Sequence, residues 1–235
     1  MIQDYKSGVR KGLPICLGYL SVSFTFGLLA VNGGLPVWMA LLISVSNLTG
    51  AGQFAAVNLM IQGTSYIEIA LTTLIINLRY TLMSISLSQK IKPEVPTKHR
   101  LLMGYGITDE IFSVASLEPG MVTFPFMMGL ISISCVGWFG GTLLGALICS
   151  ALPEILSSAM GIAIYGMFIA IVIPPLKQSR PILLIVLFAV AINLVFYYVP
   201  VFHVISTGFR VIITSLIAAG IGAILFPAKE DMEND

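Results

Sequence analysis

Three charged side chains lie inside strongly apolar stretches of the chain, and they are the first candidates for chemistry. Arg79 lies in the stretch 66–88, and Asp109 and Glu110 lie together in the stretch 101–117. A charge at the centre of a membrane-sized apolar helix costs at least about 2.5 kcal/mol, so such residues normally face the protein interior and mark a functional site. One arginine and two acids leave one carboxylate that fits a proton or an incoming ammonium group.

The spacing of these residues allows them to meet. Arg79 precedes Lys90 by eleven residues and Asp109 follows Arg100 by nine. At a helical rise of about 1.5 Å per residue, the two lie at comparable depth on adjacent helices, about 16 and 14 Å from the connecting loop. Arg79 also shares a polar stripe with Asn77 and Tyr80. The alternative to a functional site is a structural ion pair that sets the helix register, with the other acid facing water at a helix break.

A second candidate is the polar interruption in the long stretch 36–62. As one straight helix this stretch would be about 40 Å long, and its middle reads Ser-Asn-Leu-Thr-Gly-Ala-Gly-Gln. Glycine allows close approach of the backbone, and a helix that begins here would offer N–H groups to an anion. Simple packing of small residues is the alternative, and the spacing of Gly137, Gly141 and Gly145 by four favours packing for that group. The candidate substrate-binding or coupling residues are therefore Asn47, Gly50, Gly52, Gln53, Asn77, Arg79, Tyr80, Asp109 and Glu110.

The elements that must position these residues are membrane helices. Of the 235 residues, 57% are apolar and 10% charged, whereas a soluble domain has about a quarter charged residues. A membrane span needs about 20 mostly apolar residues. Eight stretches are candidates: 13–32, 36–62, 66–88, 101–117, 121–150, 153–176, 181–199 and 204–226. We expect a single all-α integral membrane domain, 1–235, with six to eight transmembrane helices and at least one broken or re-entrant segment.

The basic residues complicate a simple count of spans. Ten of the twelve lysines and arginines lie in the N-terminal arm, the loop 90–100, the turn 177–180 and at Lys229, and the positive-inside rule places all four on the cytoplasmic side. Three apolar stretches separate the first cluster from the second and three more separate the second from the third, so simple single crossings would alternate the sides of these clusters. Either one stretch in each triplet enters and leaves on the same side, or inverted three-helix repeats place the loop 90–100 outside. Both versions predict triplets, 13–88 and 101–176, and a terminal hairpin, 181–226.

Other polar residues do not form a recognisable catalytic or metal site. The net charge of +1 is too small to indicate nucleic-acid binding. Neither histidine has a partner at metal-ligand spacing, and the three cysteines lack the paired spacings of metal sites. Glu68 lies near a helix end and is expected to be structural and to reach water. We expect no metal, no cofactor and no enzymatic activity.

Three motifs together resemble the AzlC-type branched-chain amino acid permeases. They are Gly-Ala-Gly-Gln-Phe-Ala-Ala at 50–56, Asn-Leu-Arg-Tyr at 77–80 and Thr-Asp-Glu at 108–110. The resemblance implies the large subunit of an exporter for leucine, isoleucine and valine, with a small hydrophobic AzlD-type membrane subunit as partner. Tyr80 departs from the histidine associated with the family at that position, which argues against a proton relay there.

The leading hypothesis is a secondary transporter that exports branched-chain or similar apolar amino acids, coupled to an ion or proton gradient. It would lie in the bacterial cytoplasmic membrane as a multi-pass protein with its N-terminus in the cytoplasm. The alternative is a passive channel or a structural membrane subunit. An intramembrane enzyme is less favoured, because both histidines lie at the edges of stretches and Asp109 is the one aspartate within a helix.

Overall fold

The computed structural model describes residues 2–149, 169, 172–173, 176–177 and 179–226. Within these residues the chain forms nine α-helices and one short 3-10 helix, so the expectation of an all-α fold is confirmed. Its only β-type contact in the described ranges is an isolated bridge between Ile91 and Val122. Most of the expected span 153–176, and with it much of the second expected triplet, lies outside the described residues.

Five of the described helices are long and apolar enough to cross a membrane. Each has at least 19 residues, close to the length that the hydrocarbon layer requires. They are α1 (Ile2–Asn32), α4 (Tyr66–Lys90), α7 (Phe124–Ile148), α9 (Arg180–Tyr198) and α10 (Thr207–Leu225). The chain is therefore a multi-pass membrane protein.

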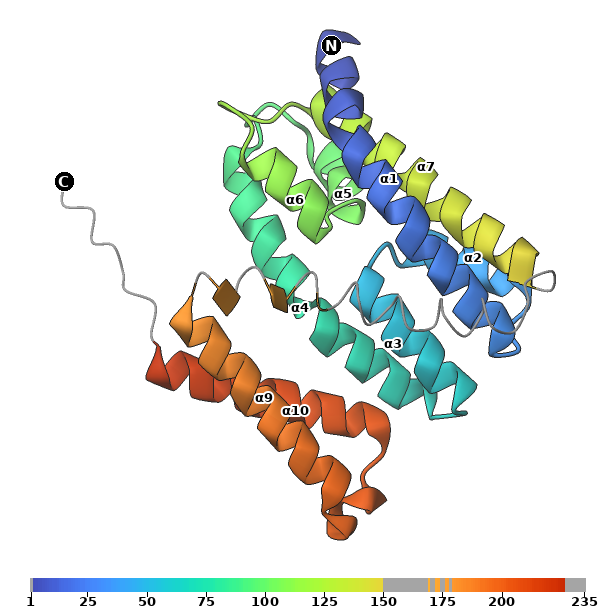
Figure 1. The fold of residues 1–235 in the computed structure, drawn as a ribbon. Helices are drawn as coiled ribbons and strands as arrows, with labels where there is room; N and C mark the ends of the chain where they lie inside the picture. The colour runs from blue at the N-terminus through green and yellow to red at the C-terminus, as the bar shows by residue number, and fades with distance from the viewer. Residues whose placement is uncertain (1, 150–168, 170–171, 174–175, 178, 227–235) are drawn as a thin grey trace.

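The expected interruption near Gly50 divides its stretch into two short helices, α2 (Val37–Ser46) and α3 (Gly50–Ile61). Between them the backbone is non-helical from Asn47 to Thr49, and the Thr49 hydroxyl donates a hydrogen bond to Asn47 Oδ1 at 2.9 Å. Such side-chain bonds compete with the helical ladder. A new helix then starts at Gly50, in the interior of the molecule (Figure 1).

The stretch 101–117, expected to be continuous, is also divided. It forms α5 (Thr97–Tyr105) and α6 (Asp109–Ser116), and the interruption runs over residues 106–108. Thr108 caps α6, since its hydroxyl accepts a hydrogen bond from Ile111 N at 3.3 Å. A capping threonine followed by two acids is a helix-start signal. Because this signal lies inside an apolar stretch, counting apolar residues alone does not reveal it.

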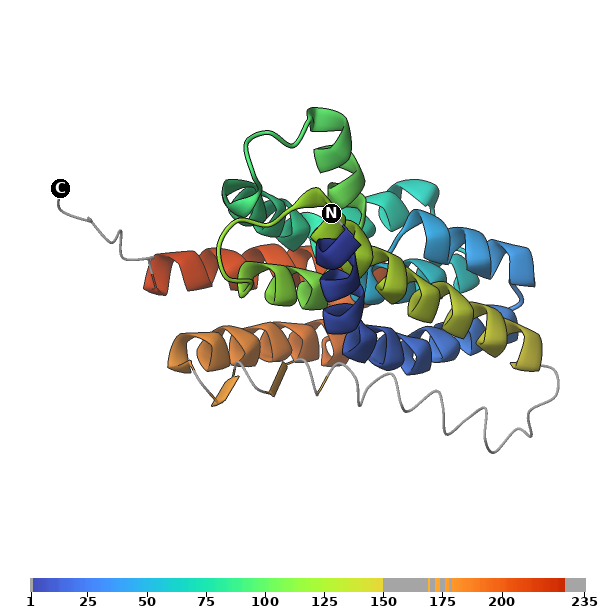
Figure 2. The same cartoon turned by 90° about the horizontal axis from the view of Figure 1, so that it is seen from above.

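Each pair of short helices forms a hairpin that returns to the end of the molecule where it started. At one end Val122 N donates to Lys90 O at 2.7 Å, so the segment that contains α5 and α6 begins and ends together. At the other end a Cβ added at Gly33, before α2, would lie 2.1 Å from Ile61 Cδ1 at the end of α3. The two hairpins thus enter the molecule from opposite ends (Figures 1 and 2).

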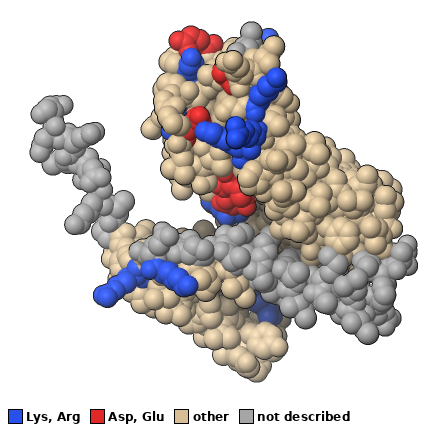
Figure 3. All heavy atoms as spheres, turned by 45° about the horizontal axis from the view of Figure 1, so that its top comes forward, with Lys and Arg blue, Asp and Glu red and all other residues tan. Residues whose placement is uncertain are grey.

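For the first two basic clusters, this arrangement resolves the conflict between the positive-inside rule and the number of apolar stretches. The hairpin that contains α2 and α3 crosses no full length, so α1 and α4 bring the N-terminal arm and the loop 90–100 to the same end. Contacts confirm this placement: Lys11 pairs with Glu118, and the Thr123 hydroxyl donates to Asp4 at 3.1 Å. Figure 3 shows charged side chains gathered at this end, whereas the adjoining flank of the molecule is almost free of them. For the first triplet, 13–88, the version in which one stretch enters and leaves on the same side is the one observed.

The long helices α1 and α7 run parallel and pack backbone to backbone. Added Cβ atoms at Gly137, Gly141 and Gly145 would each come within 2.4 Å of a carbonyl oxygen of α1. The packing role expected for this glycine series is therefore confirmed, and small residues let the two helices approach closely.

The expected terminal hairpin is also present, formed by α9 and α10 and joined by the 3-10 helix η2 (Pro200–Val204). It packs against the rest of the described structure through contacts of α10 with α4.

Candidate functional site

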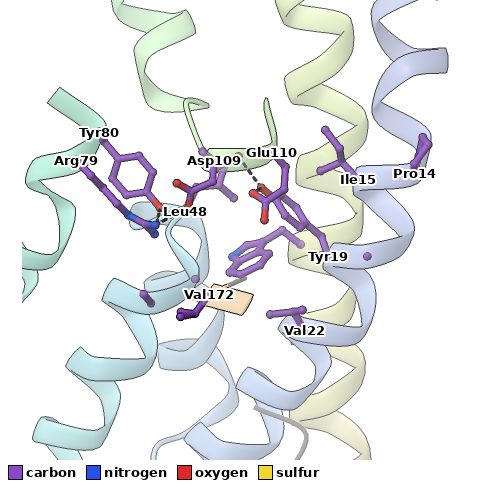
Figure 4. Close-up of a pocket in the computed structure, with 15 residues that line it drawn as sticks. Pro14, Ile15, Tyr19, Val22, Leu48, Arg79, Tyr80, Asp109, Glu110 and Val172 are labelled. Carbon is purple, nitrogen blue, oxygen red and sulfur yellow. Dashed lines mark hydrogen bonds and ion pairs between the residues drawn. The ribbon is translucent and has the colours of Figure 1, made fainter. Parts of the chain in front are cut away.

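A cavity of about 560 Å³ lies where the tips of the two hairpins meet α1, α4 and α7. Figure 4 shows Arg79 and Tyr80 on one side of it and Tyr19 on the other, with Asp109 and Glu110 between them. Its lining residues come from five described helices, from the two interruptions at Leu48 and Thr108, and from one residue further along the chain. They are Pro14, Ile15, Gly18, Tyr19, Val22, Leu48, Gly50, Ala51, Arg79, Tyr80, Thr108, Asp109, Glu110, Trp138 and Val172.

Arg79 and Asp109 form the ion pair that their equal depth predicted. Arg79 Nη1 lies 2.8 Å from Asp109 Oδ2, and Nη2 donates to the Tyr80 hydroxyl at 3.1 Å. The Arg79 guanidinium also lies over the Tyr80 ring, 4.9 Å from its centroid. Asp109 is the first residue of α6, so this pair joins α4 to the tip of a hairpin.

Glu110 is the second acid of the cavity, and its described contact is with a neutral group. The Tyr19 hydroxyl donates to Glu110 Oε2 at 2.6 Å and lies 2.5 Å from Thr108 Oγ1. Among the described residues the ion pairs are Lys11 with Glu118 and Arg79 with Asp109, so Glu110 has no basic partner there. Glu110 is thus the carboxylate left over for a cationic group.

The cavity also contains hydrogen-bond donors, which would suit an anionic group. Gly50 and Ala51 line it as the first two residues of α3, and the N–H groups of a first helical turn have no acceptor within the helix. Trp138 Nε1 and Arg79 Nε are buried donors without a partner in the described part of the chain. An anionic group would find several donors here, helped by the positive end of the helix dipole.

The rest of the wall is apolar. Ile15 and Val22 come from α1, Leu48 comes from the interruption before α3, and Val172 closes the far side. The site therefore combines a free carboxylate, unpaired donors and an aliphatic surface in one partly open cavity.

Four of the nine candidate residues lie outside this cavity. Gln53 is fully buried and donates to Ser44 Oγ at 3.3 Å, and Ser44 in turn contacts Thr142, so the glutamine ties α3 to α2 and α7. A Cβ added at Gly52 would lie 2.7 Å from Asn77 Oδ1, so Gly52 permits a close approach of α3 to α4. Asn77 and Asn47 line a separate groove of about 450 Å³ between α2, α3 and α4.

Tyr19, Thr108 and Trp138 also line the cavity, although none of them was among the nine residues predicted for the site. The Tyr19 and Trp138 rings pack edge to face, with centroids 4.9 Å apart. Thr108 could have been found from its helix-start pattern, whereas Tyr19 and Trp138 depend on how α1 packs against α7. In the described residues no three His, Cys, Asp or Glu side chains come together in a way that could hold a metal ion.

Glu68 differs from expectation. Only 5% of it is exposed, so the expectation that it reaches water is wrong. Its carboxylate accepts hydrogen bonds from Ser206 Oγ and Gly208 N. The first turn of α4 is covered by the start of α10, a contact between segments far apart in the chain.

Residues 14–152 match the AzlC protein family, over more than half of the chain. The chain belongs to this family. An uncharacterized membrane protein of Archaeoglobus fulgidus is 33% identical over 74% of this chain and 76% of its own length. The inner membrane protein YgaZ of Escherichia coli is 26% identical over 75% of each chain.

A more distant relative carries a functional name. The branched-chain amino acid transport protein AzlC of Bacillus subtilis is 22% identical over 61% of this chain and 57% of its own length. No solved structure matches the chain. Membership of the AzlC family confirms the resemblance carried by the three motifs.

Proposed function

We propose that this AzlC-family protein is a secondary transporter that exports branched-chain or similar apolar amino acids, as the large subunit of a two-component exporter. The observation that carries the proposal is the cavity itself, which offers both halves of a zwitterion a partner. Glu110 receives the ammonium group, and the first turn of α3, with Trp138 Nε1, receives the carboxylate. The aliphatic side chain packs on Ile15 and Val22.

Within this proposal the two acids have different tasks. Asp109 is neutralised by Arg79 at 2.8 Å and holds α4 against the hairpin tip. Glu110 is held by a tyrosine hydroxyl, which orients it without cancelling its charge. Asn77, expected to help Arg79 hold the helices in register, contributes instead to the approach of α3 and α4.

The proposed location is the cytoplasmic membrane, with the N-terminus and the loop 90–100 on the cytoplasmic side. The positive-inside rule supports this orientation, because exposed Lys6, Arg10, Lys11, Lys92 and Lys98 lie at the same end of the molecule. The resemblance adds a small AzlD-type subunit, so transport is to be measured with and without such a protein.

A passive channel or a structural subunit is the competing function. The opposing hairpins argue against a simple pore, since α3 and α6 both begin at the cavity and do not continue through the molecule as full-length helices. Interrupted helices that meet at a central site are typical of transporters that work by alternating access.

The test is saturable binding and transport of labelled leucine by the purified protein in liposomes. Glu110→Gln should lower leucine affinity at least tenfold, whereas the matched control Glu118→Gln, outside the cavity, should bind as wild type. Leucine, isoleucine and valine should compete, and lysine should not. Linear, non-saturable flux, or unchanged affinity in Glu110→Gln, would remove the support for this site.

A further inference from the structure

A second polar cluster lies outside the cavity, between the first turns of α4 and α10. Its centre is Glu68, whose Oε1 accepts from Ser206 Oγ at 2.5 Å and from Gly208 N at 2.8 Å. Glu68 is 5% exposed, and among the described residues no lysine, arginine or histidine forms an ion pair with it. A buried carboxylate without a counter-charge is costly, and in a membrane protein it is a candidate functional group by default.

The neighbouring Thr72 is the independent observation that points to a ligand. It lies one turn after Glu68 on α4, is 1% exposed, and its hydroxyl has no hydrogen-bond partner in the described structure. A Cβ added at Gly208 would lie 2.5 Å from Glu68 Oε1 and 2.7 Å from Thr72 Oγ1. The carboxylate and the unpaired hydroxyl therefore both pack closely against residue 208, where a side chain larger than that of glycine would not fit.

The two protonation states of Glu68 would use different partners. The Glu68 carboxylate accepts hydrogen bonds at Oε1 from the Ser206 hydroxyl and from the backbone N–H of Gly208, at the start of α10. The dipole of α10 also favours negative charge at this end. Protonation would turn one carboxylate oxygen into a donor, and the Thr72 hydroxyl, which packs against the same glycine, has no partner in the described structure. Neutralisation would also weaken the charge-assisted bonds that hold α10 to α4.

Among the described residues of the elements packed around it, no other titratable side chain forms a hydrogen bond or ion pair with Glu68. The Arg210 guanidinium, on α10, donates to the carbonyl oxygens of Ile205 and His203. The His203 ring, in η2, contacts Tyr197 O. Helix α3, which packs on another face of α4, has no titratable side chain. A proton needs one acceptor, whereas a metal cation would need several more oxygen ligands than the described residues provide.

We propose that Glu68, with Thr72, binds the coupling proton, at a site separate from the substrate cavity. This rests on the proposed transport function and deepens it. Glu68 lies in the first turn of α4, at the end opposite the basic loop 90–100, which is the outer end in the proposed orientation. A proton moving down its gradient enters from that side, and its binding would loosen the contact between α4 and the terminal hairpin.

The experiment separates substrate exchange from gradient-driven transport in proteoliposomes that contain the full chain. Leucine exchange is measured without any ion gradient, and net leucine movement is measured with an imposed pH gradient. Glu68→Gln keeps the shape of the side chain but cannot exchange a proton. We expect its exchange rate to stay within about threefold of wild type and its pH-driven movement to fall at least tenfold. The control Glu118→Gln should behave as wild type in both measurements.

Other outcomes are equally decisive. Full pH-driven movement in Glu68→Gln overturns the proposal, as does a wild type that is driven by a Na⁺ gradient and not by a pH gradient. If Glu68→Gln does not fold, Thr72→Val keeps the carboxylate and its α10 contacts, and unchanged pH-driven movement in that variant also overturns it. Absence of leucine exchange in the wild type, both with and without an AzlD-type subunit, would instead refute the proposed transport function itself.

Discussion

The ion pair between Arg79 and Asp109 joins α4 to the tip of the α5–α6 hairpin, and its energy can be worked from its exposure. The charged atoms lie 2.8 Å apart, and 38% of the arginine side chain and 30% of the aspartate side chain are exposed. An exposed pair contributes about 0–1 kcal/mol, whereas removing one partner of a buried pair costs about 3–5 kcal/mol. For this half-covered pair we expect Asp109→Asn to cost about 2 kcal/mol.

The assay is thermal unfolding of the purified protein in detergent. For a chain of this size a loss of about 2 kcal/mol corresponds to a fall in Tm of roughly 4–8 °C. The double variant Arg79→Gln/Asp109→Asn removes both charges, so it should regain more than half of that loss. Glu110→Gln is the control, because Glu110 has no ion pair in the described structure, and its Tm should change by less than about 2 °C.

The double-mutant cycle decides the matter. A coupling energy below about 0.5 kcal/mol would mean that the two residues act independently. That result would refute the assignment of Asp109 to holding the hairpin tip, and with it the division of tasks between the two acids.

Three further predictions test other parts of the structure. Gly137→Ala should lower Tm, because its Cβ would lie 2.3 Å from Cys16 O, whereas Gly140→Ala, with nothing within 4 Å, should leave Tm unchanged or raised; equal effects would contradict the tight packing of α1 on α7. A cysteine at Pro96 should be labelled from the cytoplasmic side and one at Thr64 from the outer side; labelling of both from one side would contradict the hairpin topology. Tyr19→Phe removes the hydroxyl that orients Glu110 and should weaken leucine binding about tenfold in a binding assay; wild-type affinity would show that this contact is dispensable.

The break in the stretch 36–62 could be predicted from the sequence, because the polar residues that cause it are close neighbours in the chain. Asn47 and Thr49 bond each other in place of the helical ladder, and a length of about 40 Å is too great for one span. The break in the stretch 101–117 could not be predicted from its apolar residues, since the stretch is short enough to be one span. Thr108 interrupts it by capping α6, and its pattern is recognisable only when helix starts are sought inside an apolar run.

Contacts in the site could be predicted where they depend only on how deep two residues lie along neighbouring helices. They could not be predicted where they depend on which face of a helix a residue occupies. Arg79 and Asp109 meet because they lie equally deep on neighbouring elements. Gln53 is only three residues from Gly50, yet it points to Ser44 and away from the cavity. Tyr19 reaches the cavity because glycines on α7 fix the rotation of α1 against it, which is a tertiary effect.

The two hairpins also differ in a way that orients the substrate. Both α3 and α6 begin at the cavity, so both present the positive end of a helix dipole to it. Helix α6 begins with Asp109 and Glu110, which offset that positive end and leave a cationic group favoured beside Glu110. Helix α3 begins with Gly50, Ala51 and Gly52, which carry no charge and leave the backbone N–H groups accessible. In the proposed transporter a zwitterion would therefore bind with its carboxylate towards α3 and its ammonium towards α6, and Ala51→Asp should weaken leucine binding by placing a negative charge where the carboxylate would lie.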